Sequence, residues 1–286
     1  MLTNVKKILV PVDNSEPARY ALVQAIMIAR YFQSSLKLIS VTSETEASER
    51  FKLPEYDSAR SARERLLKRY EEMVIHDHNF KDIETEHFIG DARKVIMDVI
   101  HDDDDIGLVV MGATGKKAVE RLLIGSVAQY VTRHSPIPVL LARKNPAKIE
   151  RILVPTDTSE VSERALEAAV EMAKKWDSQI DLLFVAEDFS YYSDSYDFSE
   201  VNATVKKEAE EYLASLKQKF NDQGVTIQTH IVGGDARLEI THFAKEQQVD
   251  LITMGASGKG GIERLLLGSV SEYTIMRTPI NTLIIH

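Results

Sequence analysis

The 286-residue sequence contains no cysteine, which excludes disulfide bonds, thiolate catalysis and cysteine-ligated zinc sites. It also lacks an excess of positive charge, because 35 Lys and Arg residues stand against 44 Asp and Glu residues for a formal net charge of −9. Nucleic acid and anionic membranes are themselves negative, so nonspecific binding to either is disfavoured. Long hydrophobic runs are missing too: the run Ile8 to Val12 is short, contains a proline and is followed by Asp13. We therefore expect a cytoplasmic protein that binds neither nucleic acid nor membrane.

What the sequence does contain is one unit written twice. Residues 8–16 (ILVPVDNSE) return as residues 152–160 (ILVPTDTSE), and residues 120–127 (ERLLIGSV) return as residues 263–270 (ERLLLGSV). A repeat of this length is a duplicated domain rather than a solenoid unit. We expect one domain at residues 1–143 and a second at residues 149–286, joined by a short polar linker that contains Pro146.

Strand and helix patterns alternate within each half. Apolar runs predict strands at 7–12, 36–41, 83–89, 106–111 and 139–142 in the first half, and at 151–156, 180–186, 225–232, 250–254 and 282–285 in the second. Segments with helical spacing of apolar residues separate these strands, which implies right-handed crossovers. The fold class predicted is α/β, with two tandem, doubly wound, five-stranded and mainly parallel sheets of the Rossmann-like type. Ligands of such sheets bind at the carboxyl ends of the strands.

The loop after the fourth predicted strand of each half carries paired glycines. Gly112-Ala113-Thr114-Gly115 is followed after nine residues by Gly125-Ser126, and the second half repeats the pattern with Gly255, Gly258, Gly268 and Ser269. Glycines let backbone N–H groups approach an anion, and a helix N-terminus favours phosphate. The alternative is a glycine turn followed by an ordinary serine N-cap. The position directly after a strand favours a phosphate-binding loop, although the spacing is not that of a P-loop and no lysine follows the glycine.

This G-x2-G-x9-G-[ST] pattern resembles the nucleotide loop of the universal stress protein family, and the opening strands that end in Val10-Pro11-Val12-Asp13 and Val154-Pro155-Thr156-Asp157 resemble that family as well. The resemblance covers nearly the whole chain. The chain resembles tandem members of the ATP-binding branch, which implies an adenine nucleotide alpha hydrolase-like fold. It implies ATP, or another adenine nucleotide, together with Mg²⁺ that reaches Asp13 and Asp157 through the nucleotide. The nucleotide-binding residues that it implies are Pro11, Val12, Asp13, Val41, Met111, Gly112, Gly115, Gly125, Ser126 and Val127 in the first half, and Pro155, Thr156, Asp157, Val185, Met254, Gly255, Gly258, Gly268, Ser269 and Val270 in the second.

Several of these positions keep a simpler interpretation. Val41 and Val185 read equally as buried strand residues, and Asp13 as the residue that starts the following helix. The repeated segment Gly90-Asp91-Ala92-Arg93 is interpreted as a turn with an Asp helix cap, and Lys116, Lys117 and Lys259 as solvated loop cations. The tyrosine-rich insertion around residues 190–200 has no counterpart in the first half; it covers the second pocket or forms a partner surface, and the sequence does not choose between the two.

The function expected is that of an ATP-binding universal stress protein with a regulatory or stress-resistance role. The alternatives are a slow ATPase and a structural stress module without nucleotide. No residue set is assigned to catalysis, because the sequence has no Walker lysine and no nucleophile with a poised base. The resemblance further implies that the two halves form an intramolecular pseudo-dimer through strands 139–142 and 282–285, with a homodimer also open. The protein partner stays undefined.

Overall fold

The computed structural model describes residues 5–44, 59–115, 124–145, 148–186, 199–258 and 267–286. The chain divides into two compact units, Met1–Asn145 and Pro146–His286. The loop cations Lys116, Lys117 and Lys259 and most of the tyrosine-rich insertion lie outside the described residues.

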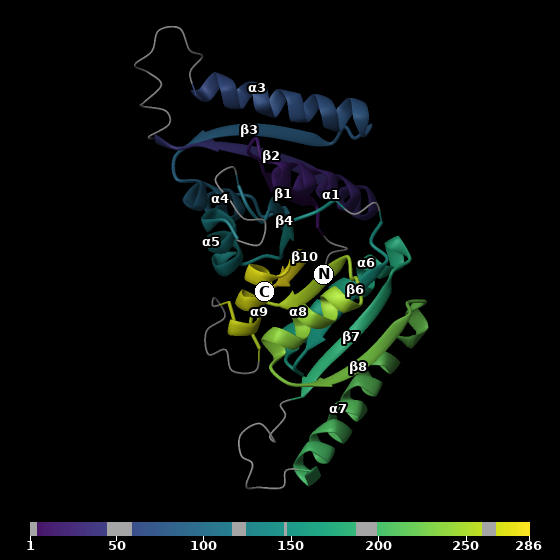
Figure 1. The fold of residues 1–286 in the computed structure, drawn as a ribbon. Coiled ribbons are helices and arrows are strands. Elements are labelled where there is room, and N and C mark those ends of the chain that lie inside the picture. The colour runs from purple at the N-terminus through teal and green to yellow at the C-terminus, as the bar shows by residue number, and fades with distance from the viewer. Residues whose placement is uncertain (1–4, 45–58, 116–123, 146–147, 187–198, 259–266) are drawn as a thin grey trace. The chain divides into compact units, whose positions relative to one another are not determined.

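The first unit alternates strands and helices throughout. Its elements are β1 (Lys7–Pro11), α1 (Glu16–Phe32), β2 (Ser35–Thr42), α3 (Ala59–Glu72), the π-helical turn η2 (Met73–Asp77), β3 (Ile83–Ile89), α4 (Ala92–Asp102), β4 (Ile106–Gly112), α5 (Ser126–His134) and β5 (Val139–Ala142). All four strand pairs are parallel, in the order β3-β2-β1-β4-β5 (Figure 1).

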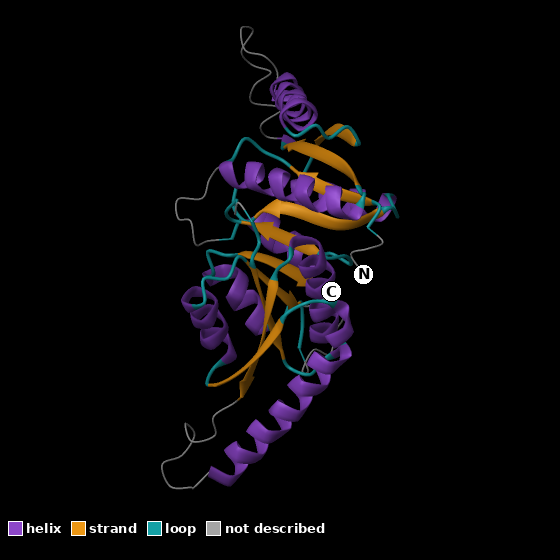
Figure 2. Ribbon diagram, turned by 90° about the vertical axis from the view of Figure 1, so that its right-hand side faces the viewer, coloured by secondary structure: helices purple, strands orange, loops and turns teal. Residues whose placement is uncertain are grey.

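The second unit repeats this plan. Its elements are β6 (Arg151–Thr156), α6 (Glu160–Trp176), β7 (Gln179–Ala186), α7 (Ser199–Lys219), the 3₁₀ turn η4 (Asn221–Gln223), β8 (Ile227–Gly233), α8 (Ala236–Glu246), β9 (Leu251–Gly255), α9 (Ser269–Arg277) and β10 (Asn281–Ile285). Its strands are also parallel, in the order β8-β7-β6-β9-β10, and helices lie on both sides of its sheet (Figure 2). The predicted fold class is confirmed.

Local capping explains where the first helix of each unit begins and ends. The Ser15 hydroxyl accepts a hydrogen bond from the Ala18 N–H, and Ser159 does the same for Ser162, which satisfies one of the N–H groups left over at a helix start. Both helices end at a residue in the left-handed conformation, Gln33 with φ 59° and Asp177 with φ 56°. The chain therefore turns sharply into β2 and β7, which pair with β1 and β6.

Charged side chains bridge the outer strands of each sheet, with opposite signs in the two units. In the first, Lys37 on β2 lies 3.6 Å from Glu84 and 3.2 Å from Glu86, both on β3. In the second, the equivalent residue on β7 is Asp181, which is fully buried and accepts hydrogen bonds from Arg151 Nε at 3.0 Å and Nη2 at 3.1 Å. His230 Nε2 of β8 also lies 3.0 Å from Asp181. A buried carboxylate is tolerated here because each oxygen has a partner.

Among the described helices, none combines the length and the apolar character that a membrane crossing requires.

Candidate functional site

A cavity of about 620 Å³ opens at the carboxyl ends of β1, β2 and β4 in the first unit. Parallel strands bring their carboxyl ends to one edge of the sheet, which is why residues far apart in sequence meet there. All ten residues that the sequence singled out in this half line the cavity: Pro11, Val12, Asp13, Val41, Met111, Gly112, Gly115, Gly125, Ser126 and Val127. Its volume falls within the range of small-molecule and cofactor sites.

Gly112 and Gly125 differ in whether the surrounding protein leaves room for a side chain. A Cβ added to Gly112 would lie 2.8 Å from the Pro17 carbonyl carbon and 2.9 Å from the Ala18 N, so Gly112 lets α1 pack closely against β4. A Cβ at Gly125 would meet its nearest atom, the Gly115 N, at 3.5 Å, which is ordinary contact. The protein itself therefore requires a glycine at 112 and does not require one at 125.

Helix α5, which follows Gly125, starts without a side-chain cap. Gly125 is the N-cap of α5, and this helix start has no side-chain cap hydrogen bond within the described part of the chain. Gly268 has the same place before α9, whereas α1 and α4 are capped by Ser15 and Asp91. The serine N-cap considered from sequence is thus wrong, because Ser126 is already the first residue of α5. The N–H groups at the start of α5 face a cavity that its own residues line, and such groups attract anions.

The loop after β1 is held in place by its own carboxylate and by a tyrosine. Asp13 Oδ1 accepts from the Ser15 N–H at 3.0 Å and from the Ser15 hydroxyl. Tyr70, which is buried on α3, donates its hydroxyl to the Asp13 carbonyl oxygen at 3.1 Å. Burial raises the pKa of Tyr70, so the phenol keeps its proton as a donor. Asp13 therefore lines the cavity and holds Ser15 in place, and Ser15 rather than Asp13 caps α1.

The second unit builds the corresponding loop with more hydroxyl groups. Asp157 Oδ1 accepts from the Ser159 N–H at 3.1 Å and the Ser159 hydroxyl at 2.5 Å. Thr156, at the place of Val12, has its hydroxyl 3.1 Å from that of Ser162 and 3.3 Å from that of Tyr212 on α7. A Cβ at Gly258 would collide with Asp157 Oδ2. The acid and the glycine loop thus lie side by side in both units.

Sequence reasoning missed other residues of the first cavity. They come from helices as well as strands and comprise Ser15, Ala18, Ile39, Arg63, Ala92, Ile96, Thr114, Ile124 and Ala128. The repeated Gly90-Asp91-Ala92-Arg93 segment could have found one of them. The Asp cap predicted there is confirmed, since Asp91 accepts from the Arg93 N–H at 2.9 Å, and the residue between the two lines the cavity. Arg63 carries no comparable signal, because its helix reads as a charged surface helix.

Comparisons with known proteins agree with this architecture. The sequence profile of the Universal stress protein family matches residues 4–143 and again residues 148–286. A universal stress protein of Methanocaldococcus jannaschii is 35% identical over 128 residues, which are 44% of this chain and 75% of that protein. The universal stress protein YxiE of Bacillus subtilis is 33% identical over 131 residues, 43% of this chain and 88% of that protein.

Two solved structures share the fold over almost the full length. A universal stress protein from Archaeoglobus fulgidus has a TM-score of 0.68 at 21% identity and covers 98% of each chain. A protein of unknown function from Pseudomonas aeruginosa has a TM-score of 0.70 at 17% identity, covering 99% of this chain and 93% of that one. With one family match in each half and the same parallel sheet in both, the chain belongs to the universal stress protein family and carries its domain in tandem.

Proposed function

We propose that this universal stress protein binds an adenine nucleotide, ATP in the first instance, in each unit and has a regulatory or stress-resistance role. The observation that carries the proposal is the uncapped start of α5, which opens into a 620 Å³ cavity lined by the glycine loop and by Asp13. Phosphates would accept from the N–H groups of Ser126 and Val127, and the apolar ends of β1 and β2 would border base and sugar. The matching start of α9 at Gly268 supports a second site.

The residues present fit a Mg²⁺ ion that arrives with the nucleotide. Mg²⁺ keeps several waters and is commonly held by one or two carboxylates together with substrate phosphates. A Cβ at Gly115 would lie 3.2 Å from Asp13 Oδ2, so this carboxylate oxygen faces the glycine loop where phosphate would lie. No cluster of three or more acidic or histidine side chains that could cage a metal occurs among the described residues. Asp13 and Asp157 would therefore each supply one oxygen to a metal held mainly by the nucleotide.

Binding is favoured over catalysis because the proposed contacts act on ground-state phosphates. Binding the substrate and the transition state equally well does not raise kcat. We expect any hydrolysis to be far slower than the roughly 1–100 s⁻¹ of dedicated phosphoryl-transfer enzymes. The slow ATPase remains the second candidate, and a stress module without nucleotide the third.

Two measurements test the proposal. Mass spectrometry of the supernatant from heat-denatured, purified protein identifies any nucleotide that co-purifies, and titration calorimetry with ATP and Mg²⁺ gives the affinity and the number of sites. Binding of two ATP molecules per chain supports the proposal. Absence of binding by both methods contradicts it, and several turnovers per second in a phosphate-release assay would favour the enzyme.

A further inference from the structure

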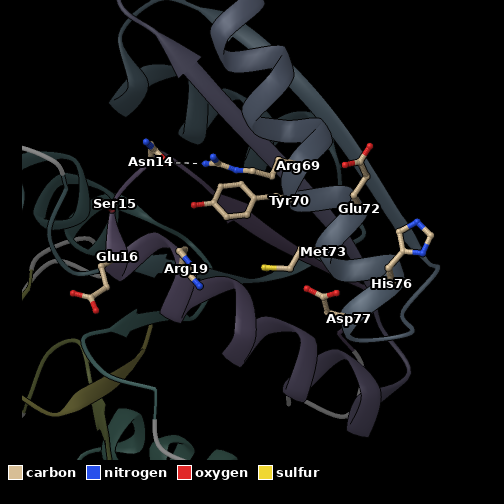
Figure 3. A pocket seen from close by; sticks show the side chains of 10 residues that line it. All are labelled: Asn14, Ser15, Glu16, Arg19, Arg69, Tyr70, Glu72, Met73, His76 and Asp77. Carbon is tan, nitrogen blue, oxygen red and sulfur yellow. Dashed lines mark hydrogen bonds between the residues drawn. The ribbon is translucent and has the colours of Figure 1, made fainter.

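A second cavity, of about 750 Å³, lies in the first unit between the start of α1 and the end of α3 with its π-helical turn η2. Figure 3 shows how its side chains are arranged. Arg19 and Glu16 on α1 and Arg69 on α3 lie on the side of the loop at Asn14 and Ser15. Tyr70 and Met73 lie in the middle, and Glu72, His76 and Asp77 lie at the far end. Two arginines and one glutamate thus give one end a net positive charge, and two carboxylates make the other end negative, with an apolar centre between them.

The charges that face each other across this groove are not paired. Arg19 on one side and Glu72 and Asp77 on the other form no ion pair with any described residue, and all three are exposed. Arg69 is engaged only locally, donating to Asn14 Oδ1 at 2.7 Å with its guanidinium 5.9 Å from the centre of the Tyr70 ring. The π-helical turn supplies part of this wall, and such turns are frequent at functional sites.

The duplicated unit provides an internal comparison. Alignment of the first strands places Glu163 at the position of Arg19, and alignment of Tyr212 with Tyr70 places Lys219 at the position of Asp77. In the second unit these two side chains close the space between α6 and α7, because Lys219 Nζ lies 3.5 Å from Glu163 and 3.1 Å from Glu167. An ion pair therefore bridges these two helices in the second unit, whereas Arg19 and Asp77 form no such pair among the described residues of the first.

Residues of α3 that line the groove also hold the loop after β1, and that loop lines the first cavity. Tyr70 donates to the Asp13 carbonyl and Arg69 to the Asn14 side chain, so two successive residues of α3 hold the loop after β1. Ser15 lines both cavities. A displacement of α3 relative to α1 would change the position of Asp13.

We propose that this groove docks a short segment of a partner protein that presents an acidic, an apolar and a basic side chain in that order along its length. The acidic side chain meets Arg19, the apolar one packs on Tyr70 and Met73, and the basic one meets Glu72 and Asp77. A polypeptide suits the site because the two charged ends lie apart on either side of an apolar centre, so that one extended segment can meet all three. Docking would be communicated to the nucleotide cavity through Tyr70; this coupling, unlike the docking itself, rests on the proposed function.

The docking is tested with a phage-displayed library of random 12-residue peptides selected on the full-length chain. The probe variant is Arg19→Glu with Asp77→Lys, which copies the closed arrangement of the second unit. The control is Arg30→Glu with Asp98→Lys, which has the same net charge and changes exposed residues outside the groove. We expect enriched peptides to contain the acidic–apolar–basic order, to bind the control as the wild type in fluorescence polarisation, and to bind the probe variant at least tenfold more weakly. Enriched peptides that bind all three proteins equally, or a selection without enrichment, overturn the proposal, as does an enriched set in which the charges play no part.

The coupling has its own readout. Tyr70→Phe keeps the ring in the groove and removes only the hydroxyl that bonds Asp13. A selected peptide should change the affinity of the wild type for ATP severalfold and should leave that of the Tyr70→Phe variant unchanged, while binding both proteins equally. An equal shift in the two proteins refutes the route through Tyr70. If the chain binds no ATP at all, the proposed function fails while peptide binding still decides the docking proposal.

Discussion

Two glycines of one loop, Gly112 and Gly125, should respond in opposite ways to the same substitution. At Gly112 an added Cβ would lie 2.8 Å from a backbone carbon of Pro17, and backbone cannot move aside cheaply. At Gly125 the closest atom would be 3.5 Å away, and the backbone angles of φ −72° and ψ 148° are open to any residue. Gly112→Ala is therefore a test of packing, and Gly125→Ala a test of ligand contact.

The expected magnitudes separate the two effects. Overpacking at Gly112 should cost about 1–3 kcal/mol, which at about 2–4 °C per kcal/mol lowers Tm by several degrees. Alanine at the N-cap of α5 should cost less than about 1 kcal/mol. If phosphate lies against Gly125, its Cβ displaces hydrogen bonds to a charged group worth about 1.5–3 kcal/mol. That loss corresponds to roughly a tenfold to a hundredfold weaker affinity for ATP.

Titration calorimetry and thermal unfolding decide the matter together. Because two sites are proposed, Gly125→Ala is combined with Gly268→Ala, whose added Cβ would also stay 3.4 Å or more from other atoms. This double variant should fold like the wild type and bind ATP poorly. Wild-type affinity in the folded double variant would refute the phosphate-loop assignment, and an unchanged Tm for Gly112→Ala would refute the packing argument.

Three further expectations concern charge. Asp13→Asn together with Asp157→Asn should leave ATP binding in place and remove its dependence on Mg²⁺, measured with Mg²⁺ or EDTA present; retained dependence would contradict the metal role. Burial, with a nearby arginine, lowers the pKa of His286 to about 4, below the value of about 6.5 expected when unfolded. Its contribution to stability is therefore full above pH 6.5 and lost as the pH falls toward 4, so urea unfolding of His286→Gln should depend less on pH in that window. Asp181→Ala should lower the free energy of unfolding by about 3 kcal/mol because it leaves a partly buried arginine without its carboxylate, whereas Glu211→Ala, in an exposed helix pair, should change it by less than about 0.5 kcal/mol.

The sequence predicted the strands well because they are continuous apolar runs buried on both faces. Residues 83–89, 139–142 and 151–156 have the predicted bounds, and the other strands differ by one or two residues at one or both ends. The segment between the second and third predicted strands has helical spacing, yet it becomes π-helical from Met73, since the shift from i→i+4 to i→i+5 bonding leaves no trace in apolar spacing.

The cavity was predictable only where it follows the strands. The ends of β1, β2 and β4 and the glycine loop carry motifs, so their residues could be named in advance. Tyr70 and Arg63 come from a crossover helix, and which of its side chains reach the loop depends on how that helix is placed on the sheet. The packing need for glycine at 112, and its absence at 125, could be recognised only from the positions of the neighbouring atoms.

The opposite charges of the outer strands have a consequence for folding. Neighbouring domains of similar sequence can exchange strands as they fold, which is a known failure of repeat proteins. Here Glu84 and Glu86 on β3 pair with Lys37 of the same sheet. If β3 paired with β7 instead, those two carboxylates would lie next to the carboxylate of Asp181. In the reverse exchange β8 would leave Lys37 without an acid and Asp181 without His230. Charge at these positions therefore favours pairing of each half with its own outer strand over exchange between the halves.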